Sequence, residues 1–331
     1  MNKVLLIGGG GYVGTVLTQY FLDSQQKVVC IDRFIYDNKW SIVNFEKHKN
    51  YQFINGDFSN YNLLDSIIDG VDHVVILGGL VGDPITKKYP KTSEKINDIA
   101  LKKCIDYFDD KNISKVIFIS TCSNYGLVPE NILADENYEL RPLSLYARAK
   151  VDNEKYLLSK KGKVNYSGVI LRFATAFGLS DRMRFDLTIS QFTRELYMNK
   201  ELLVFDENTR RPYCHVNDFA RLIELVFKSK KELVDFEIFN AGGTDNNYTK
   251  KMIVEAILEK IPNCHINYNQ NDSDPRNYRV DFTKVKKQLN FTPKYDLRFG
   301  IEELLTAFEN GKYLSEDIIK YGNYKLNYSF D

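Results

Sequence analysis

The chain has 331 residues, of which 44% are hydrophobic, so it is long and apolar enough for one large domain or two closely packed ones. Its formal net charge of +1 offers no basic surface for nucleic acid, and its apolar runs are far shorter than the ~20 residues that span a bilayer. Five scattered cysteines without a Cys-x-x-Cys pair give no support for a metal site and suit a reducing compartment, so we expect a cytoplasmic protein.

The first predicted elements are a buried strand over residues 3–7, a glycine-rich turn and a helix. Gly8, Gly11 and Gly14 follow the spacing Gly-x-x-Gly-x-x-Gly. Glycines at such a turn let the backbone approach a pyrophosphate closely, and the free N–H groups at the helix N-terminus attract its negative charge. A glycine turn without a ligand is the alternative, but the strand–turn–helix context favours a dinucleotide site. We predict cofactor contacts from Gly8, Gly11, Tyr12, Val13 and Gly14.

The second predicted strand, residues 28–32, ends in an acidic residue that bears on the choice of cofactor. Asp32 lies eighteen residues beyond Gly14, close to the spacing of about 20 that is typical of a carboxylate bound to the adenosine ribose. A carboxylate at this position repels the 2′-phosphate of NADP, whereas the adjacent Arg33 would attract it. We therefore predict NAD as the cofactor, with NADP as the alternative, and expect Asp32 and Arg33 to contact it.

Further apolar runs alternate with helical patterns along the rest of the chain. This alternation is typical of an α/β fold, and we predict a Rossmann-like doubly wound parallel sheet with helices on both faces. The remaining strands are predicted over residues 51–54, 73–77, 116–120, 167–173 and 236–240. Helices are predicted over residues 92–108, 145–159, 183–198, 217–228, 249–261, 282–289 and 299–308.

The second half of the chain is more polar and richer in arginine, but no Gly/Ser linker marks a clean domain boundary. We expect residues 1–175, joined by residues 213–242, to form the dinucleotide-binding domain. Residues 176–212 and 243–331 are expected to form a smaller, interleaved α/β region that binds the substrate.

Tyr146 and Lys150 stand four residues apart within the predicted helix 145–159, so both side chains project from one face. A tyrosine with a pKa near ~10 is a poor base at neutral pH, and an ammonium group beside it stabilises the phenolate. Lowering its pKa by about 3 units takes roughly 4 kcal/mol, which a lysine and a nearby cationic nicotinamide can supply together. An ordinary surface pair on a helix is the alternative, but the glycine turn upstream favours a catalytic pair.

With these features the chain resembles the extended short-chain dehydrogenase/reductases, and among them the nucleotide-sugar epimerases and dehydratases, over nearly its full length. Gly56-Asp57-Phe58 matches a motif whose acid contacts the adenine, and Leu77-Gly78-Gly79 stands where relatives line the cofactor with small residues. The resemblance therefore implies cofactor contacts from Asp57, Phe58, Leu77, Gly78, Gly79 and Lys150. It also implies a homodimer, packed through the helices near 92–108 and 145–159.

The family's catalytic hydroxyl falls on Thr121, within the motif at residues 118–126. The resemblance implies hydride transfer at C4 of a nucleotide-linked sugar, with Tyr146 removing the C4 hydroxyl proton and Thr121 orienting the same oxygen. Lys150 would keep Tyr146 ionised and bind the nicotinamide ribose. Arginines suit the substrate diphosphate because they bind it in a bidentate manner. The expected substrate contacts are Val81, Asp83, Thr121, Thr175, Arg184, Arg211 and Arg276.

Cys122 and Ser123 occupy the positions where related sugar 4,6-dehydratases carry Asp-Glu. Neither side chain replaces a carboxylic acid in that proton transfer, so dehydration is disfavoured and Cys122 is expected to be a buried structural residue. We predict an epimerase of a nucleotide-diphosphate hexose or related sugar in surface-polysaccharide synthesis.

Two alternatives to epimerisation remain open. Residues 178–187 resemble a subgroup that includes a GDP-heptose 4-dehydrogenase, so a 4-dehydrogenase or 4-ketoreductase is the first alternative. A non-catalytic NAD(P)-sensing regulator on the same fold is an alternative of another class. Such a regulator would be expected to lose Tyr146, Lys150 or Thr121, and all three residues are present.

Overall fold

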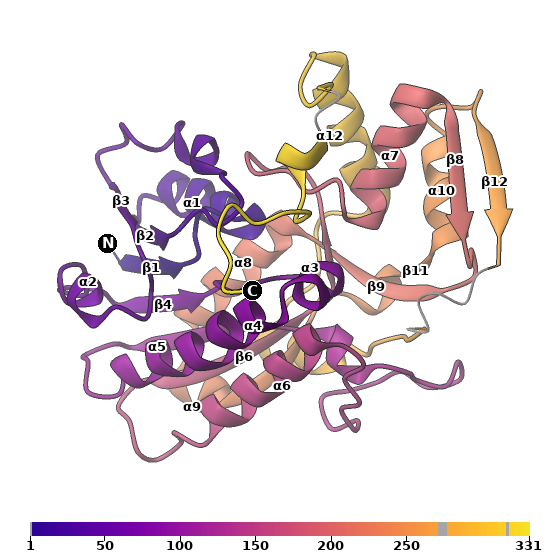
Figure 1. Cartoon of the computed structure of the whole chain (residues 1–331). Helices are drawn as coiled ribbons and strands as arrows, with labels where there is room; N and C mark the ends of the chain where they lie inside the picture. Colours follow the sequence, from indigo (N-terminus) through magenta and orange to yellow (C-terminus); the bar gives the residue numbers. More distant parts are fainter. Residues whose placement is uncertain (1, 271–276, 316–317) are drawn as a thin grey trace.

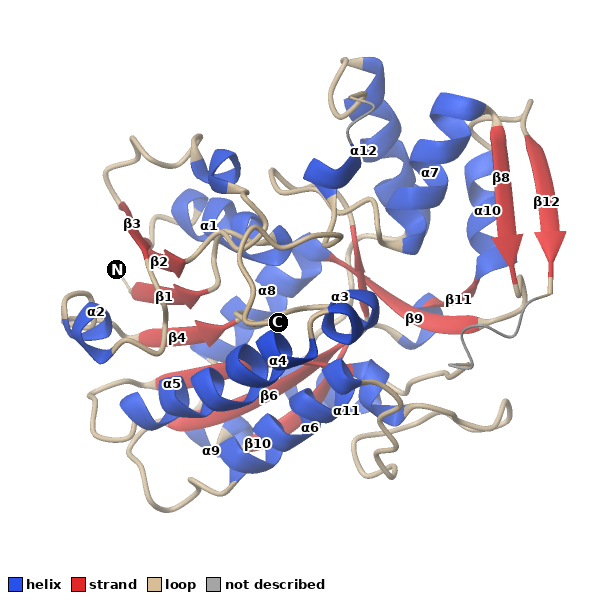
Figure 2. Ribbon diagram, in the orientation of Figure 1, coloured by secondary structure: helices blue, strands red, loops and turns tan. Residues whose placement is uncertain are grey.

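The computed structural model describes residues 2–270, 277–315 and 318–331. Seven parallel strands form one sheet in the order β10-β6-β5-β4-β1-β2-β3, as Figures 1 and 2 show. The strand order reverses between β1 and β4, which opens a crevice at the carboxyl ends of the strands. The predicted Rossmann-like sheet is therefore confirmed. Its strands are β1 (Lys3–Ile7), β2 (Lys27–Asp32), β3 (Tyr51–Asn55), β4 (His73–Ile76), β5 (Lys115–Thr121), β6 (Ser167–Phe173) and β10 (Glu237–Ala241).

Helices cover both faces of this sheet because successive side chains of a buried strand point to opposite sides. Val4 and Leu6 of β1 pack in one apolar cluster with α1 and α8, whereas Leu5 and Ile7 pack in another with α5 and α6. Figure 1 shows α5 and α6 in front of the sheet and α8 behind it. The covering helices are α1 (Tyr12–Asp23), α2 (Tyr61–Asp65), α5 (Leu101–Tyr107), α6 (Leu145–Leu158), α8 (Val216–Lys228), α9 (Lys231–Val234) and α11 (Thr283–Leu289).

The helix predicted over 92–108 is a composite of three consecutive pieces. It begins as α4 (Pro90–Glu94), passes through a π-helical turn at Lys95–Ala100, and continues as α5. Pro90 suits its first turn, where a backbone N–H would have no partner in the helix.

A smaller lobe with its own apolar core packs beside the carboxyl ends of the large sheet. Its helix α7 begins at Thr188, so the helix predicted to start at residue 183 was wrong at that end. The residues just before α7 are not helical, and the N–H of Phe185 donates a hydrogen bond to the carbonyl of Tyr321, 2.7 Å away. The lobe contains α7 (Thr188–Asn199), α10 (Lys250–Leu258), α12 (Leu297–Glu309), the pair β8 (Glu201–Phe205) and β12 (His265–Asn269), and the small sheet of β7 (Thr175–Phe177), β9 (Arg210–His215) and β11 (Asn247–Thr249).

Candidate active site

A cavity of about 960 Å³ lies at the carboxyl ends of the large sheet and extends to the smaller lobe. This volume is at the upper end of the range for ligand pockets, which run from about 300 to 1,000 Å³. Arg276 lies outside the described residues. All other predicted site residues line this cavity: Gly8, Gly11, Tyr12, Val13, Gly14, Asp32, Arg33, Asp57, Phe58, Leu77, Gly78, Gly79, Val81, Asp83, Thr121, Tyr146, Lys150, Thr175, Arg184 and Arg211.

Of the three glycines in the spacing Gly-x-x-Gly-x-x-Gly, packing excludes a side chain at Gly8 and Gly14 but not at Gly11. A Cβ at Gly8 would lie 2.5 Å from the Cα of Gly78, and one at Gly14 would lie 2.5 Å from the carbonyl oxygen of Gly9. At Gly11 the nearest atom would be 3.5 Å away, an ordinary contact. The protein itself therefore leaves room for a side chain at Gly11, and such a side chain would fill the space in front of the N-terminus of α1.

The N-terminus of α1 is well suited to an anion. Its N-cap residue is Gly11, which has no side chain to accept hydrogen bonds from the first turn of the helix. The N–H groups of that turn and the helix dipole therefore face the cavity. The pyrophosphate of a dinucleotide fits this position, with Gly8, Gly11 and Gly14 allowing its close approach.

The carboxylate of Asp32 holds the glycine turn against the loop that follows β2. One oxygen accepts a hydrogen bond from the N–H of Gly10 at 2.9 Å, and the other accepts from the N–H of Phe34 at 2.8 Å. Burial raises the pKa of the Asp32 carboxyl, and these backbone donors oppose the rise. The neighbouring Arg33 forms an ion pair with Asp57, at 2.9 Å.

Replacing Asp32 with asparagine is expected to weaken NAD binding about tenfold and to narrow the difference between the affinities for NAD and NADP. A hydrogen bond to a charged group contributes about 1.5 kcal/mol, and the variant also removes the repulsion of a 2′-phosphate. Titration calorimetry with both cofactors measures the two dissociation constants. Asp37→Asn, on the same loop but exposed and outside the cavity lining, is the control. An unchanged ratio of the two constants would contradict the role given to Asp32.

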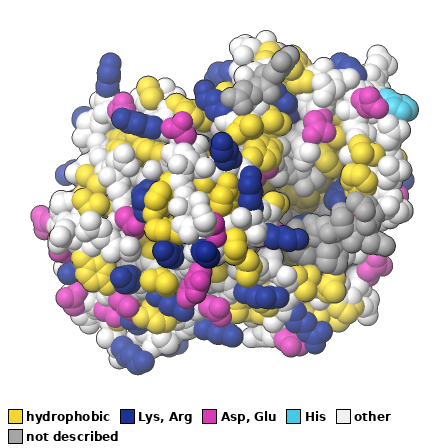
Figure 3. Space-filling model, in the orientation of Figure 1, with side chains coloured by type: hydrophobic (Ala, Val, Ile, Leu, Met, Phe, Trp, Pro, Cys, Tyr) yellow, Lys and Arg dark blue, Asp and Glu magenta, His cyan; other side chains and the backbone are white. Residues whose placement is uncertain are grey.

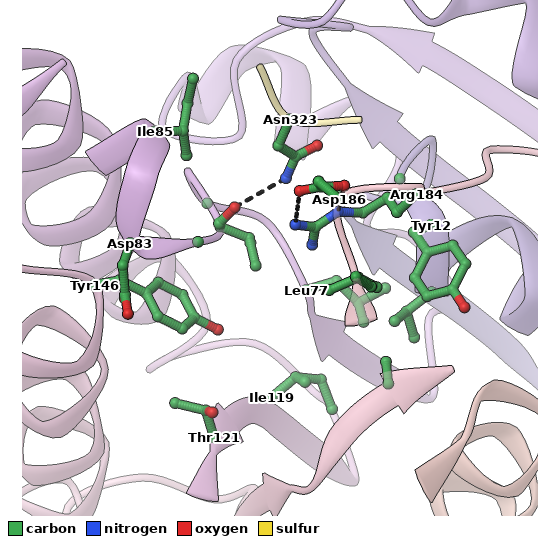
Figure 4. Close-up of a pocket in the computed structure, with 18 of the residues that line it drawn as sticks. Tyr12, Leu77, Asp83, Ile85, Ile119, Thr121, Tyr146, Arg184, Asp186 and Asn323 are labelled. Atoms are coloured by element: carbon green, nitrogen blue, oxygen red, sulfur yellow. Dashed lines mark hydrogen bonds and ion pairs between the residues drawn. The ribbon is translucent and has the colours of Figure 1, made fainter. Parts of the chain in front are cut away.

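The three predicted catalytic side chains come from two neighbouring elements. Thr121 ends β5, and Tyr146 and Lys150 lie on α6, whose first turn is capped by the side chain of Ser144. Figure 4 shows the hydroxyl groups of Thr121 and Tyr146 pointing into the same part of the cavity. The ammonium of Lys150 lies 5.9 Å from the centre of the Tyr146 ring and donates a hydrogen bond to the carbonyl of Ile119 at 2.7 Å.

Thr121 also has a structural role as a helix cap. Its hydroxyl oxygen accepts a hydrogen bond from the N–H of Ser123 at 3.1 Å and so caps the short 3-10 helix Cys122–Tyr125. The two roles are compatible, because a hydroxyl accepts through its lone pairs while its hydrogen can still donate. The cap holds the Thr121 side chain in place at the edge of the cavity.

Burial dominates the electrostatics of Tyr146 and Lys150. It raises the pKa of the Tyr146 phenol above its usual value, while the charge of Arg184 lowers it in part and that of Asp83 adds to the rise. From the sequence, Lys150 and a cationic nicotinamide were expected to lower the pKa of Tyr146. The protein groups alone do not lower this pKa below its usual value. Burial also lowers the pKa of Lys150 to about 8, an effect that Glu154 partly offsets.

The lowered pKa of Lys150 predicts how the stability of the cofactor-free protein depends on pH. Between pH 8 and 10.5 the folded state loses the Lys150 proton before the unfolded state does, so stability rises with pH. The pKa difference corresponds to roughly 3 kcal/mol over this window. Urea unfolding of the wild type and Lys150→Met should therefore give a difference in unfolding free energy that changes by that amount between pH 7.5 and 10.5. A constant difference would show that Lys150 titrates normally.

Behind the catalytic residues lies a buried network centred on Glu154, one turn beyond Lys150 on α6. Its carboxylate forms a buried ion pair with Arg172 of β6 at 2.7 Å and accepts hydrogen bonds from Asn124 and Ser120. Sequence reasoning missed this network, although an arginine within the apolar strand 167–173 was a signal that a buried partner exists. The network connects β5, β6 and α6, the elements that hold Thr121, Tyr146 and Lys150.

The substrate side of the cavity contains polar residues that sequence reasoning did not select, among them Asp186 and Asn323. Asp186 forms a largely buried ion pair with the predicted Arg184 at 2.5 Å, as Figure 4 shows. Asn323, from a part of the chain distant in sequence, also lines the cavity and donates to the carbonyl of Val81 at 2.9 Å. The density of charges in Arg182-Met-Arg-Phe-Asp186 was a signal for the first pair, whereas no local pattern marked Asn323.

Cys122 is buried, as expected for a structural cysteine, and its thiol donates a hydrogen bond to the carbonyl of Arg172 at 3.0 Å. Burial raises the pKa of the Cys122 thiol well above its usual value. The next residue, Ser123, lines the cavity. The two positions that carry acids in related 4,6-dehydratases therefore hold a neutral buried thiol and a hydroxyl.

Comparison with known proteins agrees with this geometry. A sequence model of the NAD dependent epimerase/dehydratase family matches residues 4–242. The chain belongs to this family. It is an enzyme of the extended short-chain dehydrogenase/reductase type, its cofactor is NAD, and members of the family act on nucleotide sugars. Among the described residues of this family member, no helix is both long and apolar enough to cross a membrane.

Relatives within the family carry out different reactions. The chain is 25% identical to a UDP-glucuronate 4-epimerase of Thermodesulfobacterium geofontis, over 91% of this chain and 94% of that protein. It is 22% identical to a dTDP-glucose 4,6-dehydratase of Streptomyces niveus, over 94% of each. A crystal structure of UDP-glucuronic acid 4-epimerase from Bacillus cereus, in complex with UDP-glucuronic acid and NAD, matches with a TM-score of 0.81 and 25% identity, over 93% of this chain and 99% of that one.

Proposed function

We propose that this family member is an epimerase that inverts C4 of a nucleotide-diphosphate sugar through a 4-keto sugar, in surface-polysaccharide synthesis. The observation that carries the proposal is the pair of hydroxyls of Tyr146 and Thr121, which face one part of the cavity beside Lys150. The neutral Cys122 and Ser123 next to them disfavour dehydration, because they do not provide the carboxylic acid that the loss of a C6 hydroxyl needs.

Tyr146 acts as the general base that takes the proton of the C4 hydroxyl, and Thr121 holds the same oxygen. NAD held by the glycine turn and Asp32 would supply the acceptor for the C4 hydride and the donor that returns it to the opposite face of the sugar, while Tyr146 gives the proton back to the C4 oxygen. Lys150 holds a positive charge beside Tyr146, and the hydrogen bond from its ammonium group to the carbonyl of Ile119 keeps it in place. Arg184, whose charge lowers the pKa of Tyr146, favours the ionised phenol.

The same proposal assigns the nucleotide-sugar contacts. Arg211 of β9 lines the cavity and suits the diphosphate, because guanidinium groups bind such oxygens in pairs. Thr175, Val81 and Asp83 line the part of the cavity near the sugar in this assignment. A homodimer packed through the helices near 92–108 and 145–159 is part of the proposal.

The test is to mix the NAD-loaded protein with UDP-, GDP-, dTDP- and CDP-sugars in turn and to follow NADH absorbance and sugar products. An epimerase gives a new sugar with little net NADH. Persistent, stoichiometric NADH with one donor would instead identify a 4-dehydrogenase, for example of GDP-heptose. The 4-ketoreductase reading predicts consumption of added NADH with a 4-keto sugar. No product and no absorbance change with any donor would overturn the proposal and favour a non-catalytic regulator.

A further inference from the structure

Residues 322–331, here named the strap, cross the mouth of the cavity. The chain leaves α12 in the smaller lobe, and Figure 1 shows the strap in yellow, running from that lobe across the front of the crevice to α4. The carbonyl of Gly322 accepts a hydrogen bond from Arg182 at 3.0 Å, which fixes the start of the strap beside the substrate side of the cavity.

The strap is attached to both rims of the crevice. On one rim, the N–H of Asn327 donates to the carbonyl of Ile35, in the loop that follows β2, at 3.0 Å. On the other rim, Asn323 donates to Val81, in the segment that follows β4. Because β2 and β4 lie on either side of β1 in the sheet, the strap spans the strand that leads into the glycine turn.

The far end of the strap is tied to the start of α4. The side-chain carboxylate of Asp331 accepts hydrogen bonds from the N–H groups of Lys91 and Thr92, at 2.8 and 3.1 Å, and from the Thr92 hydroxyl at 2.7 Å. The N–H of Phe330 in turn donates to the oxygen of that hydroxyl at 2.7 Å. Capping bonds of this kind satisfy the orphan donors of a helix start and hold the strap down.

Aromatic contacts place the strap over the adenosine end of the site. The guanidinium of Arg33, next to Asp32, lies 4.5 Å from the centre of the Tyr328 ring. The ammonium of Lys95 lies 3.9 Å from the centre of the Phe330 ring, and the two rings are 4.9 Å apart, edge to face. Figure 3 shows basic and hydrophobic side chains side by side in the middle of this face. Such cation–π contacts stabilise the strap in this position over the cavity.

The middle of the strap is anchored by one buried apolar side chain. Leu326 is 6% exposed and packs in a small apolar cluster with Leu80 and with Ile85 of α3 (Asp83–Lys88). The strap is therefore a packed part of the described structure, with polar contacts at its ends and an apolar contact between them.

We propose that the strap is a wall of the NAD site and retains the cofactor between turnovers. Phe330 lines the cavity, and its ring packs against that of Tyr328, which contacts Arg33. Because Arg33 is the ion-pair partner of Asp57, the Phe330 ring is placed to cover the adenosine half of NAD. NAD can then leave only when the strap lifts from Ile35 and Thr92. This inference depends on NAD as the cofactor and not on the sugar reaction, so the two can fail separately.

The test compares Phe330→Ala and a variant that lacks residues 328–331 with the wild type. Each protein is loaded with NADH, and the fall in its fluorescence is followed after a chase with excess NAD. Both variants are expected to release NADH about tenfold faster or more, and titration calorimetry should show a matching rise in the dissociation constant. A release rate within twofold of the wild type in Phe330→Ala would overturn the proposal.

Two controls distinguish a local effect of the strap on NADH release from a general destabilisation of the protein. Ile319→Ala changes a side chain that is 60% exposed in the preceding 3-10 helix Ile318–Tyr321, outside the cavity lining, and should leave the release rate unchanged. The melting temperature of the cofactor-free Phe330→Ala protein should stay close to that of the wild type. Equal acceleration by Ile319→Ala and Phe330→Ala would also count against the wall, because it would indicate general loosening of the lobe.

Discussion

Tyr146→Phe is expected to lower kcat by about 10³-fold with the sugar that the donor screen identifies, while NAD still binds. The change removes a single oxygen, and with it the group that takes the proton from the sugar hydroxyl; general bases contribute about 10²- to 10⁴-fold. Since Tyr146 lines the cavity and its ring is kept in the variant, the fold should be unaffected. Steady-state kinetics, with NAD affinity measured in parallel, checks both statements.

Tyr156→Phe provides a matched control for this result. Tyr156 lies on the same helix α6, but its hydroxyl donates to Asp106 at 2.5 Å, and it does not line the cavity. Its loss should leave kcat within about twofold of the wild type, as expected for a residue that contacts no reacting atom. If Tyr146→Phe kept more than half of the wild-type kcat, another group would have to act as the base.

Arg172→Met is expected to reduce the free energy of unfolding by about 3–5 kcal/mol. The change leaves the carboxylate of Glu154 buried without its cation, and an uncompensated buried charge is costly in a low-dielectric interior. The phenol of Tyr125 also loses its contact with the guanidinium, at 3.2 Å. Urea unfolding, followed by far-UV circular dichroism, measures the difference.

An exposed ion pair offers the comparison. Arg298 and Glu259 lie 2.8 Å apart with side chains 62% and 50% exposed, so solvent screens their attraction and Arg298→Met should leave the free energy of unfolding nearly unchanged. The double variant Arg172→Met with Glu154→Leu should recover part of the lost stability, because the unpaired charge is then removed. Equal costs for Arg172→Met and Arg298→Met would contradict the structural role of the buried pair.

The amino-acid sequence by itself predicted the cofactor half of the site, and all the residues named for it line one cavity. The glycine spacing, the position of Asp32 and the four-residue interval between Tyr146 and Lys150 are local patterns, and local periodicity is what sets a strand, a turn and the face of a helix. The cap of the helix that begins at Lys250 was equally readable, because Thr249 accepts a hydrogen bond from the N–H of Met252 three residues away.

Only the tertiary structure revealed the features that depend on partners distant in sequence, among them the start of α7 and the pKa of Tyr146. The start of α7 at Thr188 was missed because Phe185 finds its hydrogen-bond partner at Tyr321, more than a hundred residues away. The rise in the pKa of Tyr146 reflects burial by the whole fold, which overrides what its neighbour Lys150 suggests.

The strap shows the same limit most clearly. Tyr324, Leu326, Tyr328 and Phe330 alternate with polar residues, a period of two that is typical of a strand. The structure forms no strand over residues 322–331, however, and this pattern predicts no position for them. Their place over the cavity follows from contacts with Ile35, Val81 and Thr92, which only the folded chain brings together. Local patterns thus indicated the residues of the proposed chemistry, whereas long-range packing decided the burial that raises the pKa of Tyr146 and the position of the strap.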